Sequence, residues 1–199
     1  AETCNRSQSL VKVPLAVTID GEFGLGMRIS EFRKYPRQGV LAGLPDDGLM
    51  YEMGRQIARD MRSMKIDVNF APVVDVNLHP DVNTIKDRSF GPDKNLVADY
   101  GSAVMRGMQD GGVVACAKHF PGHGDTAVDS HLGLPCIDKS LAELERTELV
   151  PFRTAIEAGI PAIMSSHIMF PQIEPSGVPA TMSRRIMHDI LRGGLGFDG

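Results

Sequence analysis

The sequence predicts an α/β fold built on a parallel sheet, and more specifically a partial (β/α)8 barrel of about four strand-helix units. Short apolar, β-rich runs alternate with helical periodicities, which is the pattern of βαβ units. Each apolar run carries polar or charged residues at or near its end, as in barrels whose chemistry lies at the carboxyl ends of the strands. The chain has 199 residues, whereas a complete barrel takes ~250. We therefore expect one domain over residues 1–199, the central part of a barrel truncated at both ends.

Four apolar runs are the predicted strands. The runs, with the polar residues near their ends, are 14–20 with Asp20, 68–76 with Asp75, 113–120 with Lys118 and His119, and 162–169 with Ser165, Ser166 and His167. In a parallel sheet these ends converge on one mouth. A complete doubly wound sheet is the structural alternative. The glycines after the first run do not have the G-x-G-x-x-G spacing of a phosphate-binding turn, which disfavours that alternative.

Stripes of apolar residues at helical spacing predict the connecting helices. One stripe contains Met50, Met53, Ile57, Met61 and Met64, and a second contains Val97, Tyr100, Val104 and Met108, followed by the stop signal Gly111-Gly112. A capping box at 140–143 begins a third helix, which we expect to run toward Gly159 with a bend at Pro151. The methionines are interpreted as core packing rather than as a cofactor site.

Composition excludes several classes of function. The apolar fraction of 42%, the charged fraction of 23% and the net charge of −4 describe an ordinary soluble protein without a basic surface for nucleic acid. No apolar run approaches the ~20 residues that span a bilayer. Cys4, Cys116 and Cys136 are too few and too scattered for a disulfide framework or a zinc motif, and their odd number favours a reducing compartment. We therefore expect a cytoplasmic location, with the periplasm as the alternative.

The two ends of the chain predict a piece of a larger protein. The start, Ala-Glu-Thr-Cys, shows no apolar stretch typical of a signal peptide. The chain stops after Gly196-Phe197-Asp198-Gly199, where a helix has ended and a strand should begin.

The segment 118–131 is the candidate site. It holds three His, two Asp and one Lys directly at a strand exit, and Pro121, Gly122 and Gly124 place it in a loop. His119 and His123 stand four residues apart, the spacing of a zinc motif, but that motif requires a helix. The sequence therefore predicts no metal site.

A different unit stands at the end of this segment. Asp129 is two residues from His131, and a carboxylate beside an imidazole can orient the ring and raise its basicity, which suits a proton donor near neutral pH. Ser130 as a nucleophile would need its own base and an oxyanion hole, and the chain has no G-x-S-x-G elbow.

These motifs resemble glycoside hydrolase family 3, specifically its bacterial β-N-acetylhexosaminidase branch. The resemblance rests on KHFPGHGDT at 118–126 with Asp-Ser-His at 129–131, and it runs in register from about Pro14 to the last residue. Supporting matches are VNFAPVVDV at 68–76, DRSFG at 87–91, MSSHIMFP at 164–171, PATMS at 179–183 and GFDG at 196–199.

The resemblance implies a retaining hydrolase of β-linked N-acetylglucosamine, without a cofactor, that acts on peptidoglycan-derived or related N-acetylglucosaminides. It makes His131 the acid/base and Asp129 its partner, in place of the usual carboxylic acid. The nucleophile, an aspartate on the strand after the Gly-Phe-Asp-Gly turn, would lie beyond the end of this chain, so we expect the fragment alone to be inactive.

Sugar recognition is expected from Asp20, Arg88, Lys118 and His119. A carboxylate accepts hydrogen bonds from vicinal hydroxyls, and the cationic groups donate charge-assisted hydrogen bonds. The alternatives are a loop cap for Asp20 and a structural ion pair for Arg88.

The sequence departs from the family at the first strand exit, and other functions remain open. The family pattern Asp-x-Glu-Gly-Gly-Arg-Val reads DGEFGLGMR at 20–28, with Phe23 in place of Gly and Leu25 in place of Arg. The alternative functions are a metal-dependent hydrolase that uses His119, His123 and His131, a non-catalytic sugar-binding fragment, and a phosphorylase.

Overall fold

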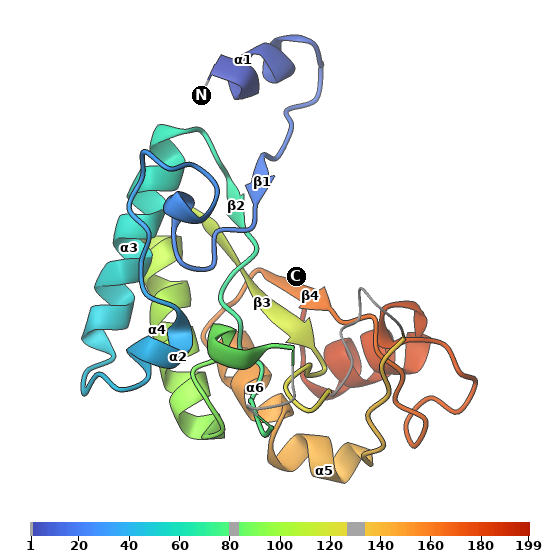
Figure 1. Cartoon of the computed structure of the whole chain (residues 1–199). Coiled ribbons are helices and arrows are strands. Elements are labelled where there is room, and N and C mark those ends of the chain that lie inside the picture. The colour runs from blue at the N-terminus through green and yellow to red at the C-terminus, as the bar shows by residue number, and fades with distance from the viewer. Residues whose placement is uncertain (1, 80–83, 127–133) are drawn as a thin grey trace.

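The computed structural model describes residues 2–79, 84–126 and 134–199. Figure 1 shows the described elements in chain order. Their bounds are α1 Glu2–Ser9, β1 Thr18–Ile19, the 3-10 turn η1 Leu25–Met27, α2 Gln38–Leu41, α3 Gly48–Ser63, β2 Val68–Asn69, the 3-10 turn η2 Lys86–Arg88, α4 Lys94–Asp110, β3 Val114–Phe120, α5 Leu141–Arg146, α6 Leu149–Glu157, β4 Ala162–Ser165, the 3-10 turn η3 Ala180–Met182, and the π-helix η4 Arg185–Gly194.

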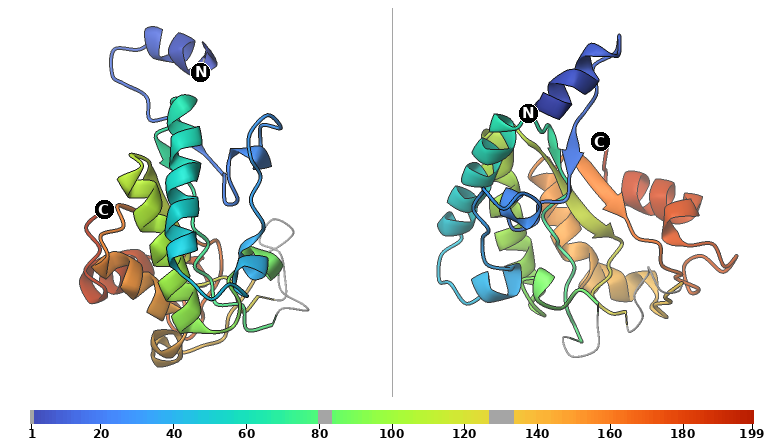
Figure 2. Two further views of the ribbon diagram at one scale, coloured as in Figure 1. Left: turned by 90° about the vertical axis from the view of Figure 1, so that its left-hand side faces the viewer. Right: turned by 45° about the horizontal axis from the view of Figure 1, so that its top comes forward.

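The four strands form one parallel sheet in the order β1-β2-β3-β4. Thr18 pairs with Val68, Val68 pairs with Val114, and Cys116 pairs with Ala162. A doubly wound sheet reverses its strand order at a switch point and carries helices on both faces. Here the order follows the sequence, and α3, α4 and α6 lie on the same side of the sheet (Figures 1 and 2). The predicted α/β fold with the arrangement of a partial barrel is therefore confirmed.

The predicted apolar stripes lie in the core between helices and sheet. α3 packs on α4, and α4 in turn packs on α6 and β3. Met50, Ile57 and Met61 are fully buried, and Met53 is nearly so. α4 ends at Asp110 with Gly111 as its C-cap, and Gly112 has a φ of 81°, a left-handed conformation that glycine adopts without steric cost. Over the described parts of the chain, no helix is long and apolar enough to cross a membrane.

Three predicted strands are shorter than expected. In the run 162–169, β4 ends at Ser165. The regular pairing in the run 14–20 is confined to β1, because β1 is an edge strand with β2 as its one neighbour within the described sheet. In the run 68–76, β2 ends at Asn69, and the next pairing is an isolated bridge between Val73 and Lys118. Pro72 lies between them and has no N–H to donate to a ladder.

The bend predicted at Pro151 is wrong. The chain breaks earlier, at Thr147, whose φ of −134° and ψ of −75° end α5 before α6 begins. Pro151 is the third residue of α6, where the backbone N–H groups have no partner within the helix, so the missing N–H of proline costs no hydrogen bond.

Candidate active site

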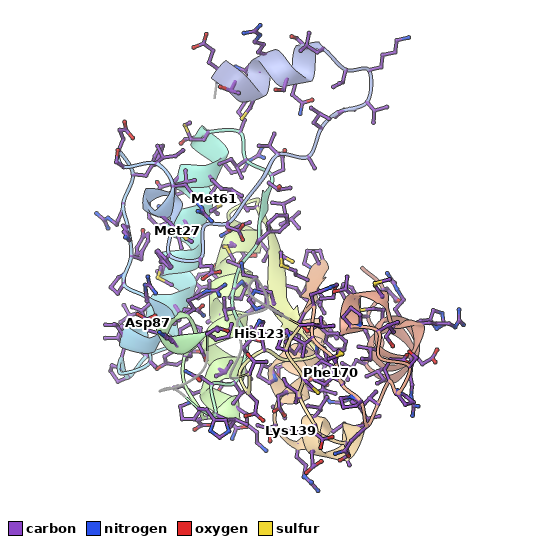
Figure 3. All side chains as sticks on the ribbon, turned by 45° about the vertical axis from the view of Figure 1, so that its right-hand side comes forward. Met27, Met61, Asp87, His123, Lys139 and Phe170 are labelled. Atoms are coloured by element: carbon purple, nitrogen blue, oxygen red, sulfur yellow. The ribbon has the colours of Figure 1, made fainter. Side chains whose placement is uncertain are left out.

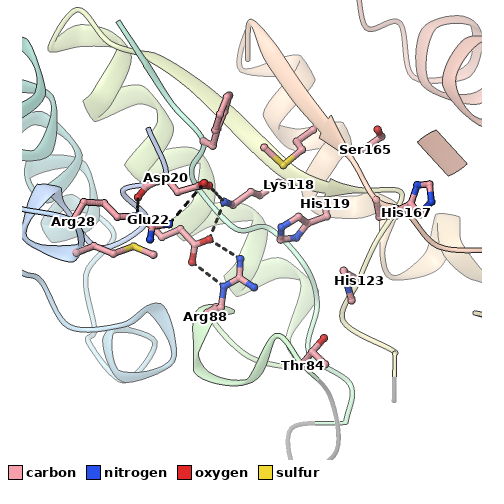
Figure 4. Close-up of a pocket in the computed structure, with 14 residues that line it drawn as sticks. Asp20, Glu22, Arg28, Thr84, Arg88, Lys118, His119, His123, Ser165 and His167 are labelled. Carbon is pink, nitrogen blue, oxygen red and sulfur yellow. Dashed lines mark hydrogen bonds and ion pairs between the residues drawn. The ribbon is translucent and has the colours of Figure 1, made fainter. Parts of the chain in front are cut away.

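A cavity of about 550 Å³ opens at the carboxyl ends of the strands. Its lining comes from the chain after β1, the end of β3 and the loop after it, the end of β4 and the segment after it, and the region of the turn η2. Figure 4 shows Asp20, Glu22, Lys118 and Arg88 meeting in this cavity. Figure 3 places His123 between the helical layer and the C-terminal part of the chain. The volume lies within the range of ~300–1,000 Å³ that is usual for small-molecule sites.

One ammonium group links two carboxylates on the floor of this cavity. Lys118 in β3 is buried, and its Nζ lies 2.9 Å from Asp20 Oδ1 and 2.8 Å from Glu22 Oε1. The side chain of Glu22 is 3% exposed, whereas that of Asp20 is 43% exposed. Both acids stand directly after β1, and the 98-residue separation of Asp20 from Lys118 is closed by the parallel register of the sheet.

Arg88 holds the same buried carboxylate from the other side. Its Nε lies 2.9 Å from Glu22 Oε2 and its Nη2 lies 2.6 Å from Glu22 Oε1, a bidentate geometry. Burial alone would raise the pKa of the Glu22 carboxyl, but hydrogen bonds and charges from Arg88 and Lys118 outweigh burial and lower this pKa to about 2. Glu22 is therefore ionised at neutral pH, and it fixes the positions of both cations.

A second carboxylate, Asp75, organises the two histidines that follow. It is fully buried, and its Oδ2 lies 2.7 Å from His119 Nδ1. Its Oδ1 accepts hydrogen bonds from the backbone N–H of His119 at 3.1 Å and of His123 at 2.7 Å. Burial alone would raise the pKa of the Asp75 carboxyl, but the facing histidines and these hydrogen bonds lower it. The imidazole of His119 lines the cavity.

His123 lies beside His119, with 5.6 Å between the ring centroids. The Thr126 hydroxyl donates to the His123 carbonyl, so its oxygen accepts from His123 Nδ1 at 2.7 Å. Burial lowers the pKa of the His123 imidazole. The loop packs tightly here: a Cβ on Gly124 would stand 1.8 Å from the Val76 carbonyl oxygen, so only glycine fits.

An ion-pair network holds the loop that follows β3. Lys139 Nζ lies 2.6 Å from Asp125 Oδ2 and 2.5 Å from Glu148 Oε1. His79 Nε2 lies 2.7 Å from the other oxygen of Asp125. Burial alone would lower the pKa of the Lys139 ammonium, but the two carboxylates raise it. The network therefore ties residues on both sides of the segment 127–133 to the start of α6.

The structure brings together the four residues expected to bind sugar: Asp20, Arg88, Lys118 and His119 all line the cavity (Figure 4). The roles of these side chains stay predictions. The expected acid/base His131 and its partner Asp129 lie outside the described residues.

Sequence reasoning missed Glu22, the ion-pair partner that joins Lys118 to Arg88. The signal was present, because Glu22 occupies the acidic position of the pattern Asp-x-Glu after the first strand. Asp75 was recognised only as a polar residue near a strand end. Within the described ranges, no cluster of three or more His, Cys, Asp or Glu side chains could hold a metal ion.

Comparison with known proteins identifies the family to which the sequence is similar. The glycosyl hydrolase family 3 N-terminal domain matches residues 2–199. A β-hexosaminidase of Thiobacillus denitrificans is 37% identical over 206 residues, which cover all of this chain and 56% of that protein. The chain thus spans little more than half the length of this curated relative.

Two solved structures are similar to this chain in sequence and fold. A family 3 β-N-acetylglucosaminidase from a Paenibacillus species is 41% identical with a TM-score of 0.85, over 94% of this chain and 36% of that one. NagZ from Neisseria gonorrhoeae, solved in complex with N-trifluoroacetyl-D-glucosamine, is 33% identical with a TM-score of 0.89, over 98% of this chain and 59% of that one.

Proposed function

The chain belongs to glycosyl hydrolase family 3, and on this premise we propose that it forms part of a retaining β-N-acetylhexosaminidase that removes β-linked N-acetylglucosamine. The observation that carries the proposal is the cavity with Asp20, Lys118, His119 and Arg88 at the carboxyl ends of the strands. Charged donors beside an exposed carboxylate suit a ligand rich in hydroxyl groups. The complex of the Neisseria relative with a glucosamine derivative supports the same class of sugar.

The mechanism that we propose uses two residues of the segment after Thr126. His131 gives a proton to the departing sugar oxygen and then takes one from the attacking water, while Asp129 orients the imidazole. A histidine in this role avoids a second negative charge beside a nucleophilic carboxylate. The nucleophile is an aspartate in the part of the barrel that follows Gly199. Support comes from the family motif and from the network at Asp125 and Lys139, which flanks this segment.

The experiment compares hydrolysis of a chromogenic N-acetyl-β-glucosaminide by the 199-residue chain with hydrolysis by the protein continued through the remaining strands. We expect turnover from the longer protein only. Equal turnover from both would contradict a nucleophile beyond Gly199. Binding of N-acetylglucosamine without turnover by the longer protein would instead favour a sugar-binding role.

The dyad is tested in the longer protein by His131→Ala. The loss of general acid/base catalysis should lower kcat about 10²–10⁴-fold, with the Kd for N-acetylglucosamine unchanged. His188→Ala is the matched control, because His188 is exposed on η4 and lies outside the cavity lining. An unaltered kcat in His131→Ala would refute the assignment. Running the same assay with phosphate as acceptor separates hydrolysis from phosphorolysis.

A further inference from the structure

The two oxygens of Asp75 have separate tasks. Oδ1 accepts from the backbone N–H groups of His119 and His123, which anchors the chain at the end of β3. Oδ2 faces the imidazole of His119 at 2.7 Å from Nδ1. The carboxylate is fully buried and is not part of the cavity lining, so it acts on the cavity through the two histidines that it holds.

This arrangement decides which ring nitrogen of His119 carries the proton. An ionised carboxylate can only accept hydrogen bonds, so the nitrogen that faces it must be protonated. The lowered pKa of Asp75 keeps the group ionised at neutral pH. In the neutral imidazole the other nitrogen, Nε2, is then an acceptor. Within the described residues, the side-chain hydrogen bond of the His119 ring is the one between Nδ1 and Asp75.

We propose that Asp75 is a positioning residue that fixes His119 in the Nδ1-protonated tautomer and thereby presents Nε2 to the cavity as a hydrogen-bond acceptor for a hydroxyl group of the substrate sugar. The inference rests on the proposed sugar-binding function of the cavity. Its physical basis is complementarity, because a hydroxyl group both donates and accepts. The neighbouring Lys118 and Arg88 can only donate, so a hydroxyl whose oxygen they bind still has its proton to donate, and Nε2 offers an acceptor for it in addition to Asp20.

A purely structural role for Asp75 is distinguishable by Asp75→Asn. The amide oxygen of asparagine can replace Oδ1 and keep the two backbone hydrogen bonds. The amide NH₂ then replaces Oδ2 and donates toward His119 Nδ1, which moves the ring proton to Nε2. The acceptor facing the sugar becomes a donor while the anchoring of the chain is retained.

The first measurement is the tautomer of His119 by ¹⁵N NMR of the full-length protein in alkaline solution. His119→Gln identifies the signal. We expect protonated Nδ1 in the native protein and protonated Nε2 in Asp75→Asn. Protonated Nε2 in the native protein would overturn the proposal without any variant, and this readout does not depend on turnover. Failure of the proposed hydrolase function would instead appear as absent turnover with the expected tautomer.

The second measurement is kcat/KM of Asp75→Asn with a chromogenic N-acetyl-β-glucosaminide and with its monodeoxy analogues. We expect kcat/KM for the parent sugar to fall about 5- to 150-fold, the effect of one mispaired polar group. One deoxy analogue should distinguish the two proteins. Removal of its hydroxyl group should lower kcat/KM of the native protein and should change kcat/KM of Asp75→Asn little. Equal losses for every analogue, or an unchanged kcat/KM for the parent sugar, would overturn the proposal.

Discussion

Replacement of Glu22 by Gln should remove a pH-dependent contribution to stability. The Glu22 side chain is 3% exposed and is bound by Arg88 and Lys118, and the pKa of its carboxyl falls from 4.5 to about 2. At 1.36 kcal/mol per pKa unit, this difference corresponds to about 3 kcal/mol of unfolding free energy. Because the folded-state pKa is depressed, the contribution is fully present above pH 4.5 and is lost as the pH falls toward 2.

The assay is urea unfolding of the native protein and of Glu22→Gln, followed by circular dichroism between pH 7 and pH 2. The native protein should be more stable by about 3 kcal/mol at pH 7, and the difference should shrink toward zero near pH 2. The comparison of two proteins at each pH cancels the titration of other carboxylates. Glu157→Gln is the control, because Glu157 is exposed at the end of α6, and its effect should be small at every pH. A difference for Glu22→Gln that stays constant with pH would refute the reasoning.

Four further predictions concern the cavity and the loop that follows β3. Asp20→Asn should weaken binding of N-acetylglucosamine about tenfold by calorimetry. The unfolding free energy should change by less than about 1 kcal/mol, because this carboxylate is 43% exposed. A loss of unfolding free energy that exceeds the loss of binding free energy would make Asp20 a structural cap. Gly124→Ala should destabilise by about 1–3 kcal/mol in urea, since the new Cβ would stand 1.8 Å from the Val76 carbonyl oxygen; an unchanged midpoint would contradict this packing. Lys139→Met should cost roughly 3 kcal/mol, because it leaves the buried Glu148 without its cation, and Glu148→Gln should restore part of that loss. Activity of the full-length protein should survive dialysis against a chelator, whereas its loss and recovery with added zinc would favour a metal-dependent hydrolase.

The sheet was predictable because its signal is local. Each strand combines an apolar run with a polar end, α3 and α4 show their own periodicity, and α5 begins at a capping box. The lengths of β1 and β2 were not predictable in this way, because regular pairing depends on neighbours as well as on apolar residues. Val73 is as buried as a strand residue, yet Pro72 interrupts the ladder before it. Similarly, the break at Thr147 depends on how two short helices pack, which no pattern in 140–159 reveals.

The candidate site was predictable in its members but not in their connections. Asp20 and Lys118 stand at strand ends, and parallel strands bring such ends together. The partners of these residues were harder to find, since ion pairs form across the sheet between residues far apart in the chain. Glu22 joins Lys118 and Arg88 over separations of 96 and 66 residues. Only the fold shows that the Glu22 side chain is 3% exposed between two cations, whereas that of its neighbour Asp20 is 43% exposed.

Under the proposed function, this division between the two acids bears on how a charged cavity would bind a neutral sugar. A sugar hydroxyl that approached Asp20 at Oδ1 would share that oxygen with Lys118, whose Nζ lies 2.9 Å away. If Lys118 had one anionic partner, withdrawal of Asp20 would leave a buried ammonium unpaired, at a cost of several kcal/mol. Glu22 removes this cost because it stays on Lys118 at 2.8 Å and is itself held by Arg88. On the proposed sugar-binding role, Asp20 could therefore exchange its ion pair for sugar hydroxyls while Lys118 stays paired with Glu22.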